Sequence, residues 1–260
     1  MIDPRLAGQN VLVTGGAGNV GAAISRAFAA QGACVAIHYL AQDRPAPANV
    51  RWDHITPTTA AAAELAEELG NGSFAVSADL AEPGEARRLV HEVGGRAGAI
   101  NVLVNNAAHC ESPDSVESLN AESLWRHYQV NTIAPAVLTA EVARLRDGDA
   151  PLSVINITTD AARAFPGQTG YGTSKAALEA LTRSTALDLA GRGIRVNAVA
   201  PGPVQTGWIT EDLIAEVNEI VPMGRVGTPD EIADAVVYLA SHQARWITGQ
   251  VLQVAGGHAL

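Results

Sequence analysis

The sequence predicts one α/β domain built on a doubly wound parallel sheet of about seven strands, with helices on both faces. Two observations indicate this fold class. Short apolar runs alternate with alanine-rich segments of helical length along the whole chain, and most of the runs are continuously apolar. Continuous apolar runs are typical of parallel strands that are covered on both faces. No repeat or low-complexity linker interrupts the alternation, so residues 1–260 are expected to form a single domain.

Each element is expected where one of these runs or segments lies. The apolar runs predict strands at residues 10–13, 34–37, 74–76, 102–104, 153–157, 195–199 and 251–254. The segments between them predict helices near residues 19–31, 58–70, 84–95, 121–145, 170–191, 209–220 and 229–241. Ligands of a doubly wound sheet bind at the carboxyl ends of its strands, so the residues that follow each run are the first candidates for a site.

Composition and charge exclude several classes of protein. The chain has 27 acidic and 17 basic side chains and a formal net charge of −10, which disfavours nonspecific binding to nucleic acids or anionic membranes. Two cysteines are too few for a disulfide scaffold, and no His/Asp/Glu cluster has metal-ligand spacing, so we expect no metal. No apolar run approaches the roughly 20 residues of a membrane span, and residues 1–5 lack a signal-peptide pattern. A soluble cytoplasmic protein is expected.

A glycine-rich turn, Thr-Gly-Gly-Ala-Gly-Asn-Val-Gly at residues 14–21, joins the first expected strand to the first expected helix. Side chains in such a turn would block the approach of backbone N–H groups to a pyrophosphate at the helix N-terminus. No lysine follows the glycines, which argues against a nucleoside-triphosphate P-loop. The turn therefore predicts a dinucleotide site. Its expected contacts are Gly15, Gly18, Asn19, Val20 and Gly21.

The end of the second expected strand bears on the choice of cofactor. An enzyme that uses NAD usually places a carboxylate there for the ribose 2′-hydroxyl, whereas this strand ends in His38 and Tyr39. Arg44 and Arg51 follow in the next loop. This composition favours NADP(H) over NAD(H), with His38 and Tyr39 at the cofactor. Two interpretations of His38 stay open: a donor to a 2′-phosphate, or an ordinary half-buried histidine.

Residues 41–58 fit neither a strand nor a helix, because they carry three prolines and no helical period. Loops of this length are uncommon in compact domains and are often functional or mobile. Two interpretations stay open: a tolerated surface insertion, and a flap beside the adenosine end of the cofactor.

After the third expected strand, Asp79 and Leu80 also allow two interpretations. Asp79 either caps the next helix or accepts a hydrogen bond from the adenine amino group.

Tyr171 and Lys175 are one helical turn apart and share one face of an expected helix. The ordinary pKa of a tyrosine, near 10, is too high for proton exchange at neutral pH. An ammonium about 4–6 Å from the phenol favours the phenolate and lowers that pKa. We therefore expect Tyr171 to act as a general acid and base, with Lys175 lowering its pKa.

Together these motifs resemble the short-chain dehydrogenase/reductase family, in its single-domain branch. The resemblance rests on the order and spacing of motifs that cover essentially the whole chain. These motifs are the turn at 14–21, Asn105-Asn106-Ala107-Ala108, Asn131, Tyr171-x-x-x-Lys175, Pro201-Gly202-Pro203-Val204-Gln205-Thr206 and residues 247–257. The resemblance implies a Rossmann-type sheet and a homotetramer or homodimer, assembled through the helices that hold Asn131 and Tyr171 and through the last strand.

The resemblance also implies a role for each motif residue. Tyr171 would protonate a carbonyl oxygen or accept a hydroxyl proton, and Lys175 would hold the nicotinamide ribose. Asn131 would anchor a water that links Lys175 to solvent, and Asn105 would support the sheet and the adenosine ribose. Further cofactor contacts are implied at Asn106, Ala107, Pro201, Gly202, Val204 and Thr206, the last two at the nicotinamide carboxamide.

Two positions depart from the family pattern. The middle glycine of the family's turn falls on Asn19, and asparagine tolerates left-handed backbone angles better than most residues. The serine that usually binds the substrate oxygen after the fifth strand is replaced by threonine. Strand register places Thr159 there, counting back from Tyr171 gives Thr158, and Asp160 is a third candidate. We expect Thr159 in this role, since its hydroxyl can polarise a carbonyl.

The substrate pocket is expected beside these groups. Residues 207–223 would form a lid that closes over the substrate and excludes water. The expected borders and lining of the pocket are His109, Cys110, Phe165, Gln168 and Trp208.

These expectations converge on an NADP(H)-dependent oxidoreductase of the ketoreductase type. Its substrate would be a small molecule, a ketone or a secondary alcohol, that exchanges a hydride with the nicotinamide. One alternative is a reductase of pterin or imine C=N bonds, because His38-Tyr39 and Asp160 are similar to features of the family's pteridine reductases. The other is a nucleotide-binding protein without catalytic activity, against which the set of Asn131, Tyr171 and Lys175 argues.

Overall fold

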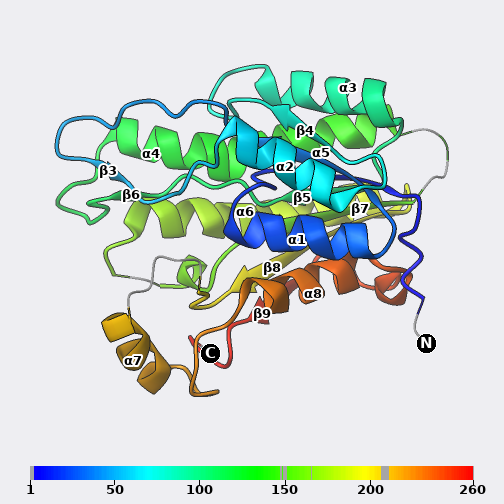
Figure 1. Ribbon diagram of the computed structural model, residues 1–260. Coiled ribbons are helices and arrows are strands. Elements are labelled where there is room, and N and C mark those ends of the chain that lie inside the picture. Colours follow the sequence, from blue (N-terminus) through cyan, green and yellow to red (C-terminus); the bar gives the residue numbers. More distant parts are fainter. Residues whose placement is uncertain (1–2, 147, 149–150, 165, 206–210, 260) are drawn as a thin grey trace.

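A seven-stranded sheet forms the centre of the protein, which was analysed as a computed structural model (Figure 1). The structure describes residues 3–146, 148, 151–164, 166–205 and 211–259. The sheet has the order β4-β2-β1-β5-β7-β8-β9, and every neighbouring pair is parallel. Its strands are β1 (Asn10–Val13), β2 (Cys34–Tyr39), β4 (Phe74–Ser77), β5 (Val102–Asn105), β7 (Leu152–Ile157), β8 (Ile194–Pro201) and β9 (Val251–Val254). The predicted fold class and its seven strands are confirmed.

The strand order explains where a ligand would bind. The chain moves outward from β1 to β2 and β4, then crosses back to β5 on the other side of β1 and continues to β9. The loops after β1 and β5 therefore leave the sheet in opposite directions and open a crevice between them.

Two hydrophobic cores cover the two faces of the sheet, and this explains why the strands are continuously apolar. Val13 of β1 packs into one core and Leu12 into the other, so that neither face of the strand meets water. Three helices cover the first face: α1 (Asn19–Ala30), α2 (Thr59–Leu69) and α8 (Pro229–Ala240). Three others cover the second face: α3 (Glu85–Ala97), α5 (Ala134–Leu145) and α6 (Thr169–Ala190).

The helix expected at 121–145 is divided by a wider turn. It consists of α4 (Ala121–Tyr128), the π-helix η1 (Gln129–Ile133) and α5. Pro135 in the first turn of α5 has no N–H to donate to the carbonyl of Asn131, four residues earlier, which favours the wider turn there. The sequence pattern missed this change because the apolar spacing continues through it.

Residues 41–58 contain one more element that the sequence did not predict. The short strand β3 (Arg51–Trp52) pairs antiparallel with β6 (Glu111–Ser112), which follows β5 (Figure 1). The remaining elements are α7 (Glu211–Ile220) and two short helices, η2 (Asp160–Ala162) and η3 (His242–Ala244). None of the helices in the described part of the chain is long and apolar enough to cross a membrane.

Candidate active site

The glycine-rich turn closes tightly at the N-terminus of α1. Gly15 has a φ of +62°, and a Cβ added to Gly21 would lie only 2.0 Å from the carbonyl oxygen of Gly15. Asn19 also has a positive φ, of +32°, which asparagine tolerates well. Among the described residues, no side chain caps α1 and no acidic residue lies in its first turn. The first amides of the helix are therefore open to an anion, and the turn fits a diphosphate.

A cleft of about 410 Å³ opens at this turn. Asn106 holds the turn from the neighbouring strand, because its Nδ2 donates to the carbonyl oxygens of Thr14 (2.9 Å) and Gly15 (3.1 Å). The cleft extends from the turn to the ends of β2 and β4, where the adenosine half of a dinucleotide is expected. Predicted cofactor contacts from four segments meet here: Gly15, Gly18, Asn19, Val20, Gly21, His38, Tyr39, Asp79, Leu80, Asn106 and Ala107.

His38 braces the turn from inside the protein. Its Nδ1 accepts from the Gly15 N–H (3.0 Å), and its Nε2 donates to the carbonyl oxygen of Ala78 (3.1 Å). Burial lowers the pKa of His38 to about 4, so the ring is neutral at physiological pH. Both ring nitrogens are engaged, and the interpretation of His38 as a donor to a 2′-phosphate is therefore wrong. It acts instead as a buried support for the glycine turn.

The loop after β2 lines the same cleft. We call residues 41–57 the strap. Seven strap residues face the cleft: Asp43, Arg44, Trp52, His54, Ile55, Thr56 and Pro57. Of the two open interpretations of this loop, a flap beside the adenosine end of the cofactor is the one that the geometry favours.

Asp79 does not cap α3, whose N-cap is Gly84, and its contact with the adenine amino group stays a prediction. Its Oδ1 accepts from the N–H of Ala81 (2.9 Å), a local turn that precedes α3. Its Oδ2 accepts from Arg44 of the strap (3.3 Å), and the residue also lines the cleft. Asp79 therefore fixes the chain after β4 and remains next to the adenosine end.

The first two turns of α6 carry Tyr171 and Lys175. The Lys175 side chain is buried, with 1% of its surface exposed, and its Nζ donates to the carbonyl oxygen of Ile157 at the end of β7 (2.8 Å). The same Nζ lies 5.8 Å from the centroid of the Tyr171 ring. The amine and the phenol thus lie on one side of the helix, as their spacing predicts.

Burial dominates the pKa values of this pair. It raises the pKa of the Tyr171 phenol, and the nearby Asp160 carboxylate acts in the same direction. Burial also lowers the pKa of Lys175 to about 8. The expectation that Lys175 lowers the phenol pKa is therefore wrong for this arrangement. Desolvation disfavours both charged forms and outweighs their attraction.

The three candidates for the substrate-oxygen partner lie in different surroundings. The hydroxyl of Thr159 donates to Oδ1 of Asp160 (3.3 Å), accepts from the Ala161 N–H (3.2 Å) and lies close enough to the Tyr171 phenol to act against the rise of its pKa. The hydroxyl of Thr158 instead donates to a carbonyl oxygen of β8 (3.2 Å). The Oδ2 of Asp160 is engaged by Nδ1 of His258 near the end of the chain (2.5 Å). Thr159 is thus the candidate whose hydroxyl shares a site with Tyr171.

Asn131 joins the segment after β5 to α6. It is fully buried, its Oδ1 accepts from the His109 N–H (2.7 Å), and its Nδ2 donates to the His109 carbonyl (2.9 Å) and to Oγ of Ser174 (3.0 Å). Its implied role in a water chain to Lys175 stays a prediction. Asn105 points across the sheet, where its Nδ2 donates to Oδ1 of Asn156 (2.8 Å), which agrees with a supporting role in the sheet.

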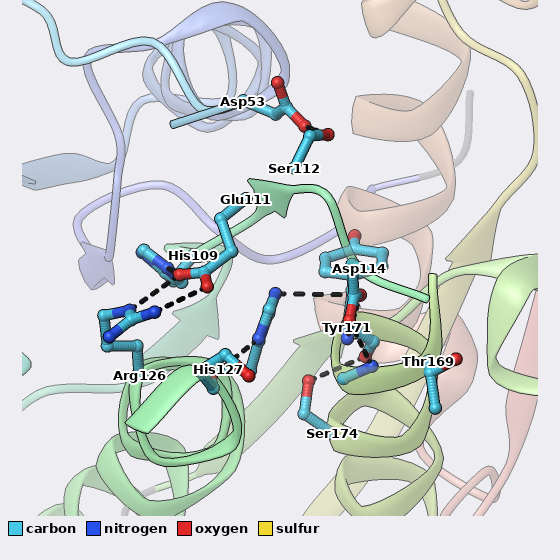
Figure 2. A network of polar contacts seen from close by, with 12 residues as sticks. Asp53, His109, Glu111, Ser112, Asp114, Arg126, His127, Thr169, Tyr171 and Ser174 are labelled. Carbon is cyan, nitrogen blue, oxygen red and sulfur yellow. Dashed lines mark hydrogen bonds and ion pairs between the residues drawn. The ribbon is translucent and has the colours of Figure 1, made fainter. Parts of the chain in front are cut away.

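Asp114 caps α6, the helix of Tyr171 and Lys175, and was missed by the sequence analysis. Its carboxylate accepts from the N–H groups of Gly170 (2.7 Å) and Tyr171 (2.9 Å), and Figure 2 shows Asp114 next to Tyr171. A Cβ on Gly170 would lie 2.9 Å from that carboxylate and 2.8 Å from Nδ1 of His127, so glycine is required there. No local pattern reveals such a cap, because 56 residues separate Asp114 from Gly170.

A second buried carboxylate lies beside this cap. Glu111 accepts from Arg126 through two nitrogens (2.6 and 2.7 Å) and from Nε2 of His109 (2.8 Å), again visible in Figure 2. Burial lowers the pKa of His109 to about 4, so that ring is neutral. This group fixes the segment that follows β5 against α4.

The remaining predicted cofactor residues lie after β8. Pro201 is the last residue of β8, and a Cβ on Gly202 would lie 2.7 Å from Cβ of Ala255, so only glycine fits there. Val204 is buried and forms an isolated bridge with Gly227. Their contacts with a nicotinamide stay predictions.

Several residues expected around the substrate pocket lie outside the described residues: Thr206, Phe165, Trp208 and the first part of the 207–223 lid. The lid stays a prediction, although α7 lies within it. Gln168 directly precedes α6 and forms an isolated bridge with Asp114.

Burial raises the pKa of Cys110 to about 12, so its thiol is protonated. In the described part of the chain, no cluster of three or more His, Cys, Asp or Glu residues could hold a metal ion.

Comparison with known proteins agrees with this geometry. Residues 15–259 match the family model described as enoyl-(acyl carrier protein) reductase. The chain is 36% identical to an uncharacterized oxidoreductase of Bacillus subtilis, over 95% of each chain. It is 32% identical to a blue fluorescent protein from a metagenomic library, solved in complex with NADPH, with a TM-score of 0.85 over 98% of this chain and 99% of that one. An angucycline C-6 ketoreductase with bound NADP is 31% identical, with a TM-score of 0.84 over 98% and 96% of the two chains.

Proposed function

Because this chain belongs to the short-chain dehydrogenase/reductase family of oxidoreductases, we propose that it is an NADP(H)-dependent ketoreductase. It transfers a hydride between the nicotinamide ring and a small-molecule ketone or secondary alcohol. The observation that carries the proposal is the Tyr171 phenol and the Lys175 amine on one side of α6, in a fold whose glycine turn opens a cleft that fits a dinucleotide.

Each side chain has a task that its surroundings favour. The Thr159 hydroxyl holds the substrate oxygen next to the phenol and polarises the carbonyl. Tyr171 donates its proton to that oxygen in reduction, and a raised pKa keeps the phenol protonated at neutral pH. Lys175, with a pKa near 8, is partly protonated at neutral pH and returns a proton to the site. When bound, the nicotinamide supplies the hydride. These protonation states favour reduction of a ketone over oxidation of an alcohol.

The preference for NADP(H) rests on charge at the adenosine end. No carboxylate ends β2, where Tyr39 stands. The Arg44 side chain is 61% exposed at the cleft and pairs with Asp79 and Glu82. A 2′-phosphate would take the place of one of these carboxylates on the guanidinium. The NADPH and NADP bound to the two structural relatives support the same choice.

The pterin and imine alternative has less support. It depended on a free acidic group after β7, whereas Asp160 is buried and engaged by His258. Ketone reduction needs no free carboxylate at this position, because the hydroxyl of Thr159 holds the substrate oxygen and Tyr171 supplies the proton. A protein that merely binds nucleotide would not need Lys175 buried, since burial of an ammonium group destabilises a fold even where it bonds to a carbonyl, as Lys175 does.

Two further properties belong to the proposal. We expect a homotetramer or homodimer in the cytoplasm. Apolar side chains exposed on the α4–α5 surface, on α8 and beside β9 would be covered by partner copies. They are Trp125, Val137, Tyr238, Trp246 and Leu252.

The test is a titration of the purified protein with NADPH and with NADH, followed by nicotinamide fluorescence. We expect enhancement by both and a lower dissociation constant for NADPH. A panel of ketones then identifies turnover through loss of absorbance of NADPH. The proposal fails if neither nucleotide gives a response, or if a dihydropterin is reduced and none of the ketones is.

A further inference from the structure

The strap crosses the cofactor cleft as a separate wall. It leaves the sheet after β2, runs to β3 beside β6 and returns to α2 (Figure 1). A Cβ on Gly18 would lie 3.3 Å from Cγ of Pro57, so this end of the strap lies against the glycine turn itself. The strap and the glycine turn therefore form facing sides of one cleft.

The strap has its own internal bracing. Asp43 near its start accepts from Nε2 of His54 (2.8 Å) and from the hydroxyl of Thr56 (2.8 Å). Trp52 donates through its indole N–H to the carbonyl oxygen of Arg44 (2.7 Å). These bonds join both ends of the strap and keep the aromatic residues at its centre in place.

The middle of the strap docks on the segment that follows β5. Beyond the β3–β6 pairing, the N–H of Asp53 donates to the carbonyl of Cys110 (2.8 Å), and its carboxylate accepts from Ser112. The rings of Trp52 and His54 lie 4.9 and 5.1 Å from the His109 ring, centroid to centroid. The strap thus spans the cleft from the β2 side to the β5 side.

The part of the cofactor under the strap is the adenosine half. The lining of this cleft includes the diphosphate turn and the residues after β2 and β4, such as Tyr39 and Leu80. Tyr171 and Lys175, which mark the nicotinamide end, are not among the described residues that line it.

His54 is a second strap residue, besides Trp52, that lines the cleft, and one of its ring nitrogens lacks a partner in the described part of the chain. Nδ1 of His54 is buried and forms no hydrogen bond with any of the described residues. Because Nε2 is engaged with the Asp43 carboxylate, Nδ1 is the ring nitrogen left for a further partner. A buried polar atom without a partner is costly, and a bound cofactor that displaced the strap slightly would relieve that cost, since the adenosine half carries both donors and acceptors.

We propose that the strap is a binding element for the adenosine half of the cofactor, with Trp52 and His54 as its contact residues. It adds an aromatic wall that the glycine turn alone does not supply, and it must release for the cofactor to leave. This inference rests on the proposed dinucleotide-dependent activity.

The test uses ADP-ribose, which carries the adenosine half and the diphosphate but no nicotinamide. Its dissociation constant is measured by isothermal titration calorimetry, and the release rate of NADPH by stopped-flow fluorescence. Trp52→Ala should weaken ADP-ribose and speed NADPH release, each about tenfold or more. Arg51→Ala is the matched control, since that side chain lies on the same short strand, is 79% exposed and does not line the cleft. It should change both values less than about twofold.

Hydrogen exchange is measured on the wild-type protein, so a folding defect of a variant cannot explain its result. Amides of residues 43–57 should become protected when ADP-ribose binds. The inference is overturned if these amides exchange equally with and without ADP-ribose, or if a folded Trp52→Ala variant binds like the wild type. If the wild type binds neither ADP-ribose nor NADPH, the proposed function fails as well, so the two failures are distinguishable.

Discussion

The catalytic end and the adenosine end of the cofactor site are held in different ways. Tyr171 and Lys175 lie on a core helix whose first turn is capped by the buried Asp114. The strap is held by a two-residue strand pair and by partly exposed polar pairs such as Asp43 with His54. Segments with few buried contacts open at a low free-energy cost. Under the proposed function, the contrast would provide a fixed geometry for proton transfer and a movable wall for cofactor exchange.

The largest effect should come from the fixed end. Tyr171→Phe removes the proton donor and leaves the ring in place, so kcat should fall by about 10²–10⁴-fold. Binding of ADP-ribose should stay close to the wild-type value, because the phenol is not part of the adenosine cleft. Steady-state kinetics and calorimetry on the same preparation check both. If Tyr171→Phe also lost affinity for ADP-ribose, the catalytic end and the adenosine end would not act independently, which would contradict this comparison.

Lys175→Met should separate function from stability. The pKa of Lys175 is about 8 in the folded protein against an ordinary value of 10.5, so between these pH values the unfolded chain binds more protons. Stability of the wild type should therefore rise with pH across that window. The turnover of the variant should fall about 100-fold. Its free energy of unfolding at pH 7 should exceed that of the wild type by about 1–3 kcal/mol, and it should not increase between pH 8 and pH 10 as that of the wild type does. Thermal unfolding at pH 7 and pH 9.5 measures this, and a less stable variant at pH 7 would contradict it.

Asp114→Ala tests how the fixed end is held. Two N–H groups at the start of α6 would lose their partner, which should cost about 1–2 kcal/mol of stability. Because Tyr171 would shift with the first turn, kcat should fall about tenfold while KM for the nucleotide stays nearly constant. Asp114→Asn keeps one acceptor and should recover part of both losses. An effect on KM alone would place Asp114 with the adenosine end instead.

The smallest effect is expected at the exposed rim of the movable end. Arg44→Ala should reduce the preference for NADPH over NADH by about fivefold, since an exposed guanidinium gives modest binding energy. The measurement is the ratio of dissociation constants for the two nucleotides. An unchanged ratio would show that a residue other than Arg44 binds the 2′-phosphate of the cofactor.

The sequence predicted the sheet well because each strand is marked locally by an apolar run. It also located the glycine turn and the Tyr171–Lys175 pair, whose spacing is local as well. The sequence did not predict the β3–β6 pair or the Asp114 cap, because each joins segments that are distant in the chain. The pKa of Tyr171 was predicted with the wrong sign, because spacing reports a neighbouring charge and not the burial that opposes it.

The choice between Thr158 and Thr159 shows the same limit at one position. Both follow the same strand, and counting along the chain could not separate them. The Thr158 N–H and hydroxyl both bond to the Val199 carbonyl on β8, whereas the Thr159 hydroxyl lies beyond the strand, bonds within the turn at Asp160 and Ala161, and is near enough to the Tyr171 phenol to influence its pKa. The two residues are distinguished by where the hydrogen bonds between β7 and β8 end, which is a feature of the tertiary structure.

The most direct test of the central claim is the fate of a deuterium label. A ketone that the protein turns over is incubated with NADPH deuterated at C4 of the nicotinamide, and the alcohol is analysed by mass spectrometry. If the Thr159–Tyr171–Lys175 group promotes hydride transfer, the wild type places one deuterium on the carbinol carbon from one of the two C4 epimers, and Tyr171→Phe forms almost no labelled alcohol. Alcohol without deuterium from both epimers, or undiminished labelling by Tyr171→Phe, would contradict the claim.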